Sequence, residues 1–142
     1  MPDNPLIIAE PAGAYARRPP LVVDCSVLAA VLFDEPERES AALALAGKAL
    51  FAPDLIDHEL ASVAVKKARA SLIEVAEQGL SDLARLAISR RRIDPTQQWA
   101  AARAHDLTAY DAAYLQLAIE LRAPLATFDK RLGQAASKVL SG

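Results

Sequence analysis

Short apolar runs alternate along this chain with longer stretches in which apolar residues recur every three or four positions. Residues 21–23, Leu-Val-Val, form the clearest run, which is typical of a strand buried on both faces. Further strands are expected at 49–52 and 124–128, with a weaker one at 90–93 and only residues 139–140 left for a fifth. Helices between strands predict a three-layer α/β domain with a mainly parallel, four- or five-stranded sheet.

Helix start signals separate these strands. Ser26, Asp34, Asp54 and Thr108 each stand before an apolar-periodic stretch and are of the residue types that cap helix N-termini. Pro in a first turn supports the helices after Asp34 and Asp94. The helices are therefore expected at about 27–33, 34–46, 55–70, 72–88, from 94, 108–121 and from 130.

The first twenty residues differ from the rest because they contain five prolines and little periodicity. Proline lacks a backbone donor, so an irregular arm is expected over residues 1–20, with at most a brief edge strand at 6–8. The single domain is expected over residues 21–142. Asp3 and Glu10 flank the short apolar stretch and no basic segment precedes it, which argues against a signal peptide.

Composition limits the class of protein. A chain of 142 residues, 53% of them apolar, is long enough for one domain with its own core. Its longest apolar runs are too short to span a bilayer, so a soluble protein without a membrane partner is expected. The single cysteine, Cys25, excludes a disulfide framework and a cysteine-based zinc cluster, and a cytoplasmic location fits. Cys25 lacks a CxxC partner, so a small buried residue is favoured over a nucleophile.

The formal net charge of −2 does not indicate a nucleic-acid-binding surface by itself. However, the chain would be net positive if a few of its carboxylates were neutralised by a cation. Basic residues cluster at 66–69 and 90–92. Such clusters also occur at helix C-termini without any partner, and a solvated surface is the favoured interpretation.

Four acidic residues are expected at one edge of the sheet. Asp24 and Asp129 each follow a strand, and right-handed crossovers place the carboxyl ends of parallel strands together. Glu59 and Asp111 lie near the starts of helices that face the same edge, and Asp111 occupies a position in an apolar stripe. Simpler roles remain open, because an acid often ends a strand or favours a helix dipole.

Four carboxylates at one place would repel one another unless some were protonated or a cation lay between them. Oxygen ligands, without cysteine or a well-spaced histidine pair, favour a hard ion such as Mg²⁺ or Mn²⁺. Carboxylates that hold such ions, which in turn hold phosphate oxygens and a water, are typical of phosphodiester hydrolysis.

The residues at these positions resemble PIN-domain ribonucleases, and among them the VapC-like toxins of VapBC toxin–antitoxin pairs. The resemblance covers roughly residues 21–135. It rests on four segments in order, Val-Asp-Cys-Ser-Val-Leu at 23–28, Ala-Pro-Asp-Leu-Ile-Asp-His-Glu-Leu-Ala-Ser-Val at 52–63, Leu-Thr-Ala-Tyr-Asp-Ala-Ala-Tyr at 107–114 and Ala-Thr-Phe-Asp-Lys-Arg-Leu at 126–132.

This resemblance implies a metal-binding and catalytic quartet with two supporting hydroxyl groups. The quartet would be Asp24, Glu59, Asp111 and Asp129, and the hydroxyl groups those of Ser26 and Thr127. It further implies Mg²⁺-dependent endoribonuclease activity, with Mn²⁺ as a substitute, a homodimer, and inhibition by a VapB-like antitoxin. Cys25 stands where the family often has threonine, and the arm at 1–20 is unusual.

Two other classes fit parts of the pattern. An aspartate phosphotransfer domain also places an aspartate after its first strand, but it wants further acids where this chain has Ser26 and residues 91–93. A catalytically silent PIN scaffold that binds RNA or protein is the other alternative. The intact set of four acids favours an enzyme over such a scaffold.

Overall fold

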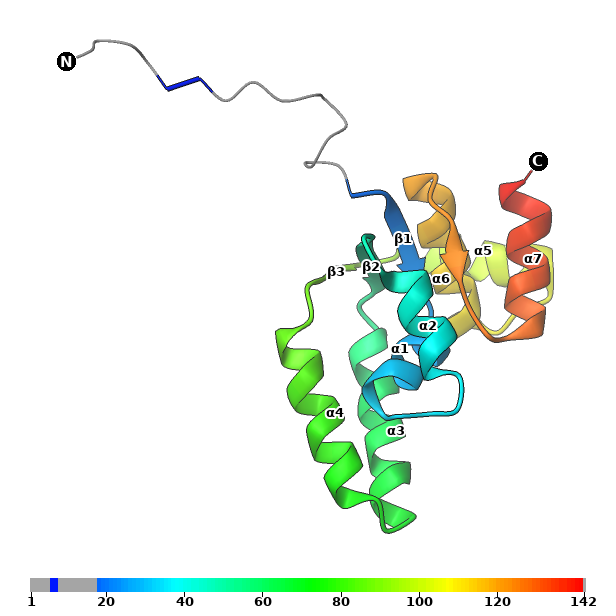
Figure 1. Ribbon diagram of the computed structural model, residues 1–142. Helices are drawn as coiled ribbons and strands as arrows, with labels where there is room; N and C mark the ends of the chain where they lie inside the picture. Colours follow the sequence, from blue (N-terminus) through cyan, green and yellow to red (C-terminus); the bar gives the residue numbers. More distant parts are fainter. Residues whose placement is uncertain (1–5, 8–17, 142) are drawn as a thin grey trace.

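The computed structural model describes residues 6–7 and 18–141 and contains one parallel sheet (Figure 1). Its strand order is β3-β2-β1-β4, so the Leu-Val-Val run lies between two neighbours and is buried. Leu21 pairs with Leu50 on one side and Val22 with Leu125 on the other. The strands are β1 (Pro20–Val23), β2 (Ala49–Pro53), β3 (Ile88–Arg91) and β4 (Leu125–Ala126).

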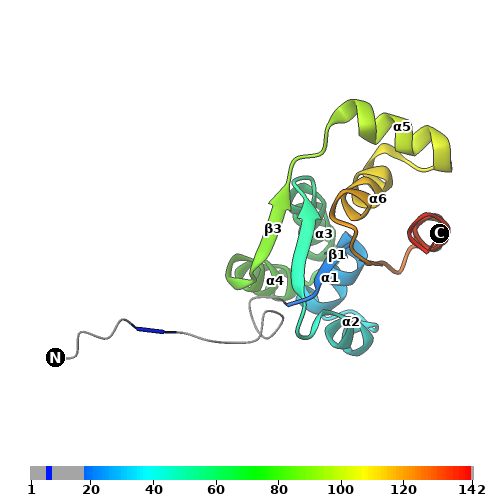
Figure 2. The ribbon, with the colours of Figure 1, turned by 90° about the horizontal axis from the view of Figure 1, so that it is seen from above.

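Helices cover the sheet in two groups. In one, α6 packs on β1 and β2, while α5 and α7 pack against α6; in the other, α3 and α4 pack side by side and both contact α1 (Figures 1 and 2). The expected α/β architecture is confirmed. The helices are α1 (Cys25–Leu32), α2 (Arg38–Leu45), α3 (Ile56–Arg69), α4 (Ile73–Arg85), α5 (Pro95–His105), α6 (Ala109–Leu121) and α7 (Lys130–Leu140). None of these described helices is both long and apolar enough to cross a membrane.

Two of the expected helix caps are confirmed. The Thr108 side chain accepts a hydrogen bond from the backbone N–H of Asp111 at the start of α6. Asp94 caps α5 in the same way, with Pro95 as the first helical residue. Both helices therefore begin where their local sequence predicted.

Three expected caps are wrong. Ser26 lies inside the first turn of α1, because that helix begins directly after β1 at Cys25. Asp34 adopts a left-handed backbone with φ of 54° and pairs with Arg38 instead, so α2 begins later. Asp54 donates its backbone N–H to the Arg91 carbonyl, which extends the pairing of β2 and β3 and delays α3 until Ile56.

Three strand predictions also need correction. The third strand is expected at 90–93 but occupies Ile88–Arg91, because its pairing with β2 sets its position. The fourth contains only Leu125–Ala126 and not 124–128, because β4 pairs only with the last two residues of β1. Residues 139–140 belong to α7, so the described part of the chain has four strands rather than five.

The expected division at residue 20 falls mostly outside the described residues. In the part of the arm that the structure describes, Leu6 and Ile7 form no strand, and their side chains are 86% and 77% exposed. Pro20 is the first residue of β1, where a missing backbone donor is tolerated.

Candidate active site

Asp24 is the buried centre of the site. It follows β1 directly, is 6% exposed and is the only polar or charged residue among the buried ones of the described chain. The hydroxyl groups of Ser26 and Thr127 both donate to its Oδ2 atom, each at 2.8 Å. No hydrogen bond to Oδ1 is present among the described residues, and no deeply buried side-chain oxygen there lacks a partner. Oδ1 is therefore still reached by solvent and free to bind.

The loop between β4 and α7 is fastened to the same two hydroxyl groups. The backbone N–H of Phe128 donates to Ser26 Oγ at 3.0 Å, and that of Asp129 donates to Thr127 Oγ1 at 2.9 Å. Each hydroxyl thus accepts one backbone bond and donates one bond to Asp24. This arrangement fixes the end of β4 against the start of α1.

Asp129 closes that loop as the cap of α7. Its Oδ1 accepts a hydrogen bond from the backbone N–H of Leu132 at 2.9 Å, and the residue is exposed. It lies three residues beyond the last residue of β4, so its position comes from the helix start and not from the strand end as expected. A capping role still leaves the second carboxylate oxygen available.

Glu59 lies in the first turn of α3 and meets a tyrosine from α6. The hydroxyl of Tyr114, which is fully buried, donates to Glu59 Oε1 at 2.6 Å. Burial raises the pKa of Glu59, and the nearby charges of Asp24 and Asp111 add to this, while the Tyr114 hydrogen bond opposes it. The raised pKa shows that a proton is one way in which this site can reduce its negative charge.

Asp111 lies in the first turn of α6 and is half-buried. Burial is the largest cause that raises its pKa, and the charges of Asp129 and Asp24 come next. A side-chain hydrogen bond with Thr108 and the charge of Arg131 act in the opposite direction. The carboxylates that follow β1 and β4 therefore both raise the pKa of Asp111.

The expected site residues come from four helix starts at one edge of the sheet. The hydrogen bonds join Asp24, Ser26 and Thr127 directly, whereas Glu59, Asp111 and Asp129 are linked to Asp24 or to each other through their charges. Within residues 6–7 and 18–141, no three acidic, cysteine or histidine side chains are close enough to form a finished metal cluster. The all-oxygen donor set suits a hard cation, and the side chains would have to rotate towards it.

Tyr114 contacts a candidate site residue, Glu59, and the sequence did not reveal this contact. The apolar stripe of α6 predicted its burial but not its hydrogen bond, because Glu59 lies 55 positions away in the chain. A buried tyrosine normally needs a partner for its hydroxyl group. That requirement, together with the position of Tyr114 three residues after Asp111, is the signal that could have identified it.

Cys25 and several residues of the basic clusters have structural roles in this chain. Burial, with the charges of Glu59 and Asp24, raises the pKa of Cys25 to about 12, so its thiol is a poor nucleophile at neutral pH. Arg90 pairs with Asp57, Lys67 pairs with Glu35, and Arg91 lies over the Phe51 ring. Residues of the clusters at 66–69 and 90–92 thus neutralise acidic side chains of this chain or cover an aromatic ring.

The fold and the site together define an α/β protein with an acidic centre at the carboxyl edge of a parallel sheet. The family model described as "PIN domain" matches residues 21–138, and the chain belongs to that family. PIN domains are commonly nucleases that use divalent metal ions.

A solved structure shares the fold of this chain. The crystal structure of PAE2754 from Pyrobaculum aerophilum is similar, with a TM-score of 0.62 and 20% sequence identity. The match covers 89% of this chain and 96% of that one, and it shows a shared fold over nearly the whole of both. No match was found among curated proteins.

Proposed function

We propose that this protein is a metal-dependent endoribonuclease that hydrolyses RNA phosphodiester bonds. The observation that carries the proposal is Asp24, which is buried, held by two hydroxyl groups and left with a free Oδ1 atom. A carboxylate fixed in this way is pre-organised to bind a cation. Asp111, Glu59 and Asp129 would supply further oxygen ligands.

The cation would be Mg²⁺, with Mn²⁺ as a substitute. When bound, such an ion polarises a phosphate and lowers the pKa of a bound water. The chain's own contribution is to keep the ligands in place: Ser26 and Thr127 orient Asp24, Thr108 fixes the first turn of α6, and Tyr114 holds Glu59.

A cleft of about 830 Å³ beside Asp129 suits the RNA strand. Phe128 and Asp129 line it together with Lys130 and Lys138. The lysines offer positive charge to the phosphate backbone, and Phe128, which is exposed, offers a face on which a base can stack. Single-stranded RNA fits these groups better than a duplex, whose bases are already stacked.

An RNA cleavage assay with purified protein tests the proposal. Cleavage should require Mg²⁺ or Mn²⁺ and stop with EDTA, and Asp24→Asn should keep the fold but reduce cleavage to the level seen without metal. Ser26→Ala should lower cleavage by about 10- to 100-fold, the usual effect of losing a group that orients a metal ligand. Asp57→Asn is the matched control, because that acid lies in the same turn as Glu59 but is already paired with Arg90; it should leave cleavage unchanged.

Cleavage that persists in Asp24→Asn would place the activity elsewhere or in a contaminant. A well-folded wild type that binds RNA without cleaving it would instead indicate a silent scaffold.

The finer proposal is that the enzyme is the toxin of a VapBC-like pair, a cytoplasmic homodimer inhibited by a small antitoxin. The resemblance of the four segments around Asp24, Glu59, Asp111 and Asp129 supports it. Expression of the wild type should stop growth, Asp24→Asn should not, and co-expression of a short neighbouring reading frame should restore growth. Unrestricted growth with an active, soluble wild-type enzyme would contradict the toxin role.

A further inference from the structure

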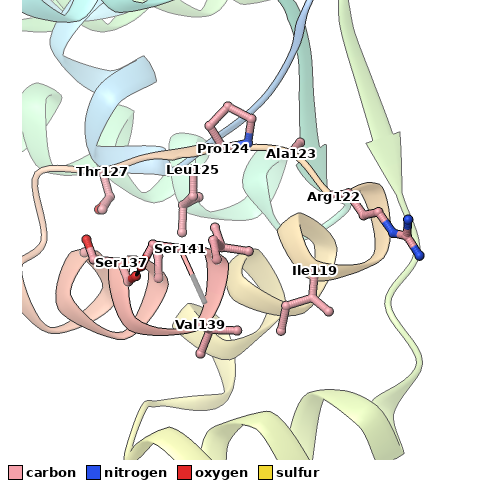
Figure 3. Close-up of a pocket in the computed structure, with 12 residues that line it drawn as sticks. Ile119, Arg122, Ala123, Pro124, Leu125, Thr127, Ser137, Val139 and Ser141 are labelled. Carbon is pink, nitrogen blue, oxygen red and sulfur yellow. Dashed lines mark hydrogen bonds between the residues drawn. The ribbon is translucent and has the colours of Figure 1, made fainter.

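A mainly apolar groove lies between β4 and α7 and reaches Thr127 at the edge of the acidic site. Its volume is about 890 Å³, and Arg122 is the one charged residue among the described residues that line it (Figure 3). We name it the β4–α7 groove. It is lined mainly by Ile119, Pro124, Leu125, Val139 and Leu140, with Arg122 at the end where β4 begins.

The floor of this groove is an unpaired strand edge. The backbone N–H of Val22 donates to the Pro124 carbonyl at 2.9 Å, and that of Asp24 donates to the Ala126 carbonyl at 3.0 Å. Leu125 lies between these two residues, and in a parallel ladder alternate residues face opposite sides. Its N–H and C=O groups therefore point away from β1, on the free side of β4, where another strand could bind both.

The same chain carries a short apolar segment near its N-terminus. Leu6 and Ile7 are the two most exposed large apolar side chains of the described residues, at 86% and 77%. With Ile8 they form a run of three aliphatic residues, a composition that favours an extended strand. Among the described residues, nothing covers Leu6, Ile7 or the groove.

We propose that residues 6–8 of a second copy of this chain occupy the β4–α7 groove as an added strand beside β4. The connection from Ile8 to Pro20 spans up to about 40 Å when extended, which is enough to reach a neighbouring subunit. Each copy would give one arm and receive one, and such a reciprocal exchange closes a two-fold dimer.

The charges at the two surfaces agree with this occupant. Asp3 and Glu10 flank the aliphatic run, and Arg122 is the cation that the groove offers. An RNA strand is a poor alternative, because an apolar groove with one cation does not suit a polyanion. The groove shares Thr127, Gly133 and Ser137 with the lining of the RNA cleft, but the docking of the arm does not depend on the four carboxylates, so the two proposals can fail separately.

Cysteine cross-linking in the full chain tests the exchange. Ile7→Cys is introduced in one preparation. Ser137→Cys or Ser141→Cys, two lining positions on the α7 side of the groove that lie about one helical turn apart, is introduced in another. After mixing, unfolding, refolding and mild oxidation, a covalent heterodimer should appear on non-reducing gels. Cys25 stays in every variant. Unfolding and refolding are carried out under reducing conditions, and oxidation begins only after refolding, when burial raises the pKa of the Cys25 thiol and lowers its reactivity.

Two controls separate docking from random collision. Leu43→Cys lies on α2 and is also well exposed (73%), so it should cross-link to Ile7→Cys at least tenfold less than the groove cysteines do. Adding Leu6→Asp to the Ile7→Cys chain should abolish the groove cross-link, whereas Leu43→Asp should not.

Three results would overturn the proposal. One is equal cross-linking at Leu43→Cys and in the groove. The second is a groove cross-link that survives Leu6→Asp. The third comes from a chain that carries both Ile7→Cys and Ser137→Cys: a disulfide formed only within one chain would show that the arm folds back on its own subunit.

Discussion

Acidic residues lie at two places at the carboxyl edge of this sheet, Asp57 near β3 (the β3 corner) and Asp24 after β1 (the β1 corner). The two places differ in how the negative charge is balanced. At the β3 corner, Arg90 donates to both carboxylate oxygens of Asp57, at 2.6 and 2.9 Å. At the β1 corner, Asp24 receives only the neutral hydroxyl groups of Ser26 and Thr127. Across the described chain, no ion pair joins Asp24, Glu59, Asp111 or Asp129 to a lysine or arginine.

The difference shows what a hydroxyl group can and cannot do for a carboxylate. An arginine fork supplies hydrogen bonds and a full positive charge, so Asp57 needs nothing more. Hydroxyl groups fix the orientation of Asp24 but leave its charge, which helps raise the pKa of Glu59 and Asp111. The carboxylate of Asp57 is paired after folding, while none of the four acids around Asp24 has a paired cation among the described residues. A bound metal ion is the simplest way to supply that charge.

The sharpest test of this comparison is the effect of a cation on stability. An ion that binds only the folded chain stabilises it by about 2.7 kcal/mol at a hundredfold excess over its dissociation constant. Mn²⁺ should therefore raise the melting temperature of the wild type. Asp24→Asn and Asp111→Asn should each raise the melting temperature without metal, because they relieve repulsion, and should abolish the Mn²⁺ effect.

Asp57→Asn is the control for that measurement, because the Arg90 corner should not take part in metal binding. It should keep the full Mn²⁺ effect. Equal Mn²⁺ effects in the wild type and in both site variants would show that the ion binds elsewhere, and the site assignment would then be wrong.

A smaller effect is expected from the bond that holds Glu59. Tyr114→Phe removes a buried hydroxyl group and should lower the free energy of unfolding by about 1 kcal/mol. Because that hydroxyl favours the ionised carboxylate, the pKa of Glu59 should rise further. Urea unfolding measures the first effect, and NMR titration of the Glu59 side chain measures the second.

Tyr110→Phe provides a matched control, since Tyr110 belongs to the same helix but is 64% exposed. It should change neither quantity. An unchanged stability in Tyr114→Phe would mean that the bond to Glu59 contributes nothing in solution.

The smallest effect on stability is expected from the ion pair between Asp57 and Arg90. Asp57→Asn breaks the ion pair with Arg90, whose side chains are 33% and 44% exposed, so the loss should stay below about 1 kcal/mol. Chemical denaturation at low and high salt should show a loss that shrinks as salt rises. Glu77→Gln, an exposed acid on α4, should have no effect, and a loss that does not depend on salt would indicate hydrogen bonding rather than charge.

Local sequence signals determined a large part of this protein. The Leu-Val-Val run predicted β1, Thr108 and Asp94 predicted two helix starts, and the acids after β1 and at the start of α6 were identified from their positions alone. Each of these inferences depends on residues within a few positions of one another, where capping and side-chain periodicity act. The family follows from the same segments.

Only the tertiary structure decided how these segments meet. The Thr127 hydroxyl reaches Asp24 across 103 positions and Tyr114 reaches Glu59 across 55, and no local pattern encodes such partners. Asp34 and Asp54 are good caps by sequence, yet an ion pair with Arg38 and the pairing of β2 with β3 hold them in other roles. Asp57 and Asp24 both lie at helix starts. Only the folded structure shows that Arg90 balances the charge of Asp57, whereas Asp24 receives two neutral hydroxyl groups.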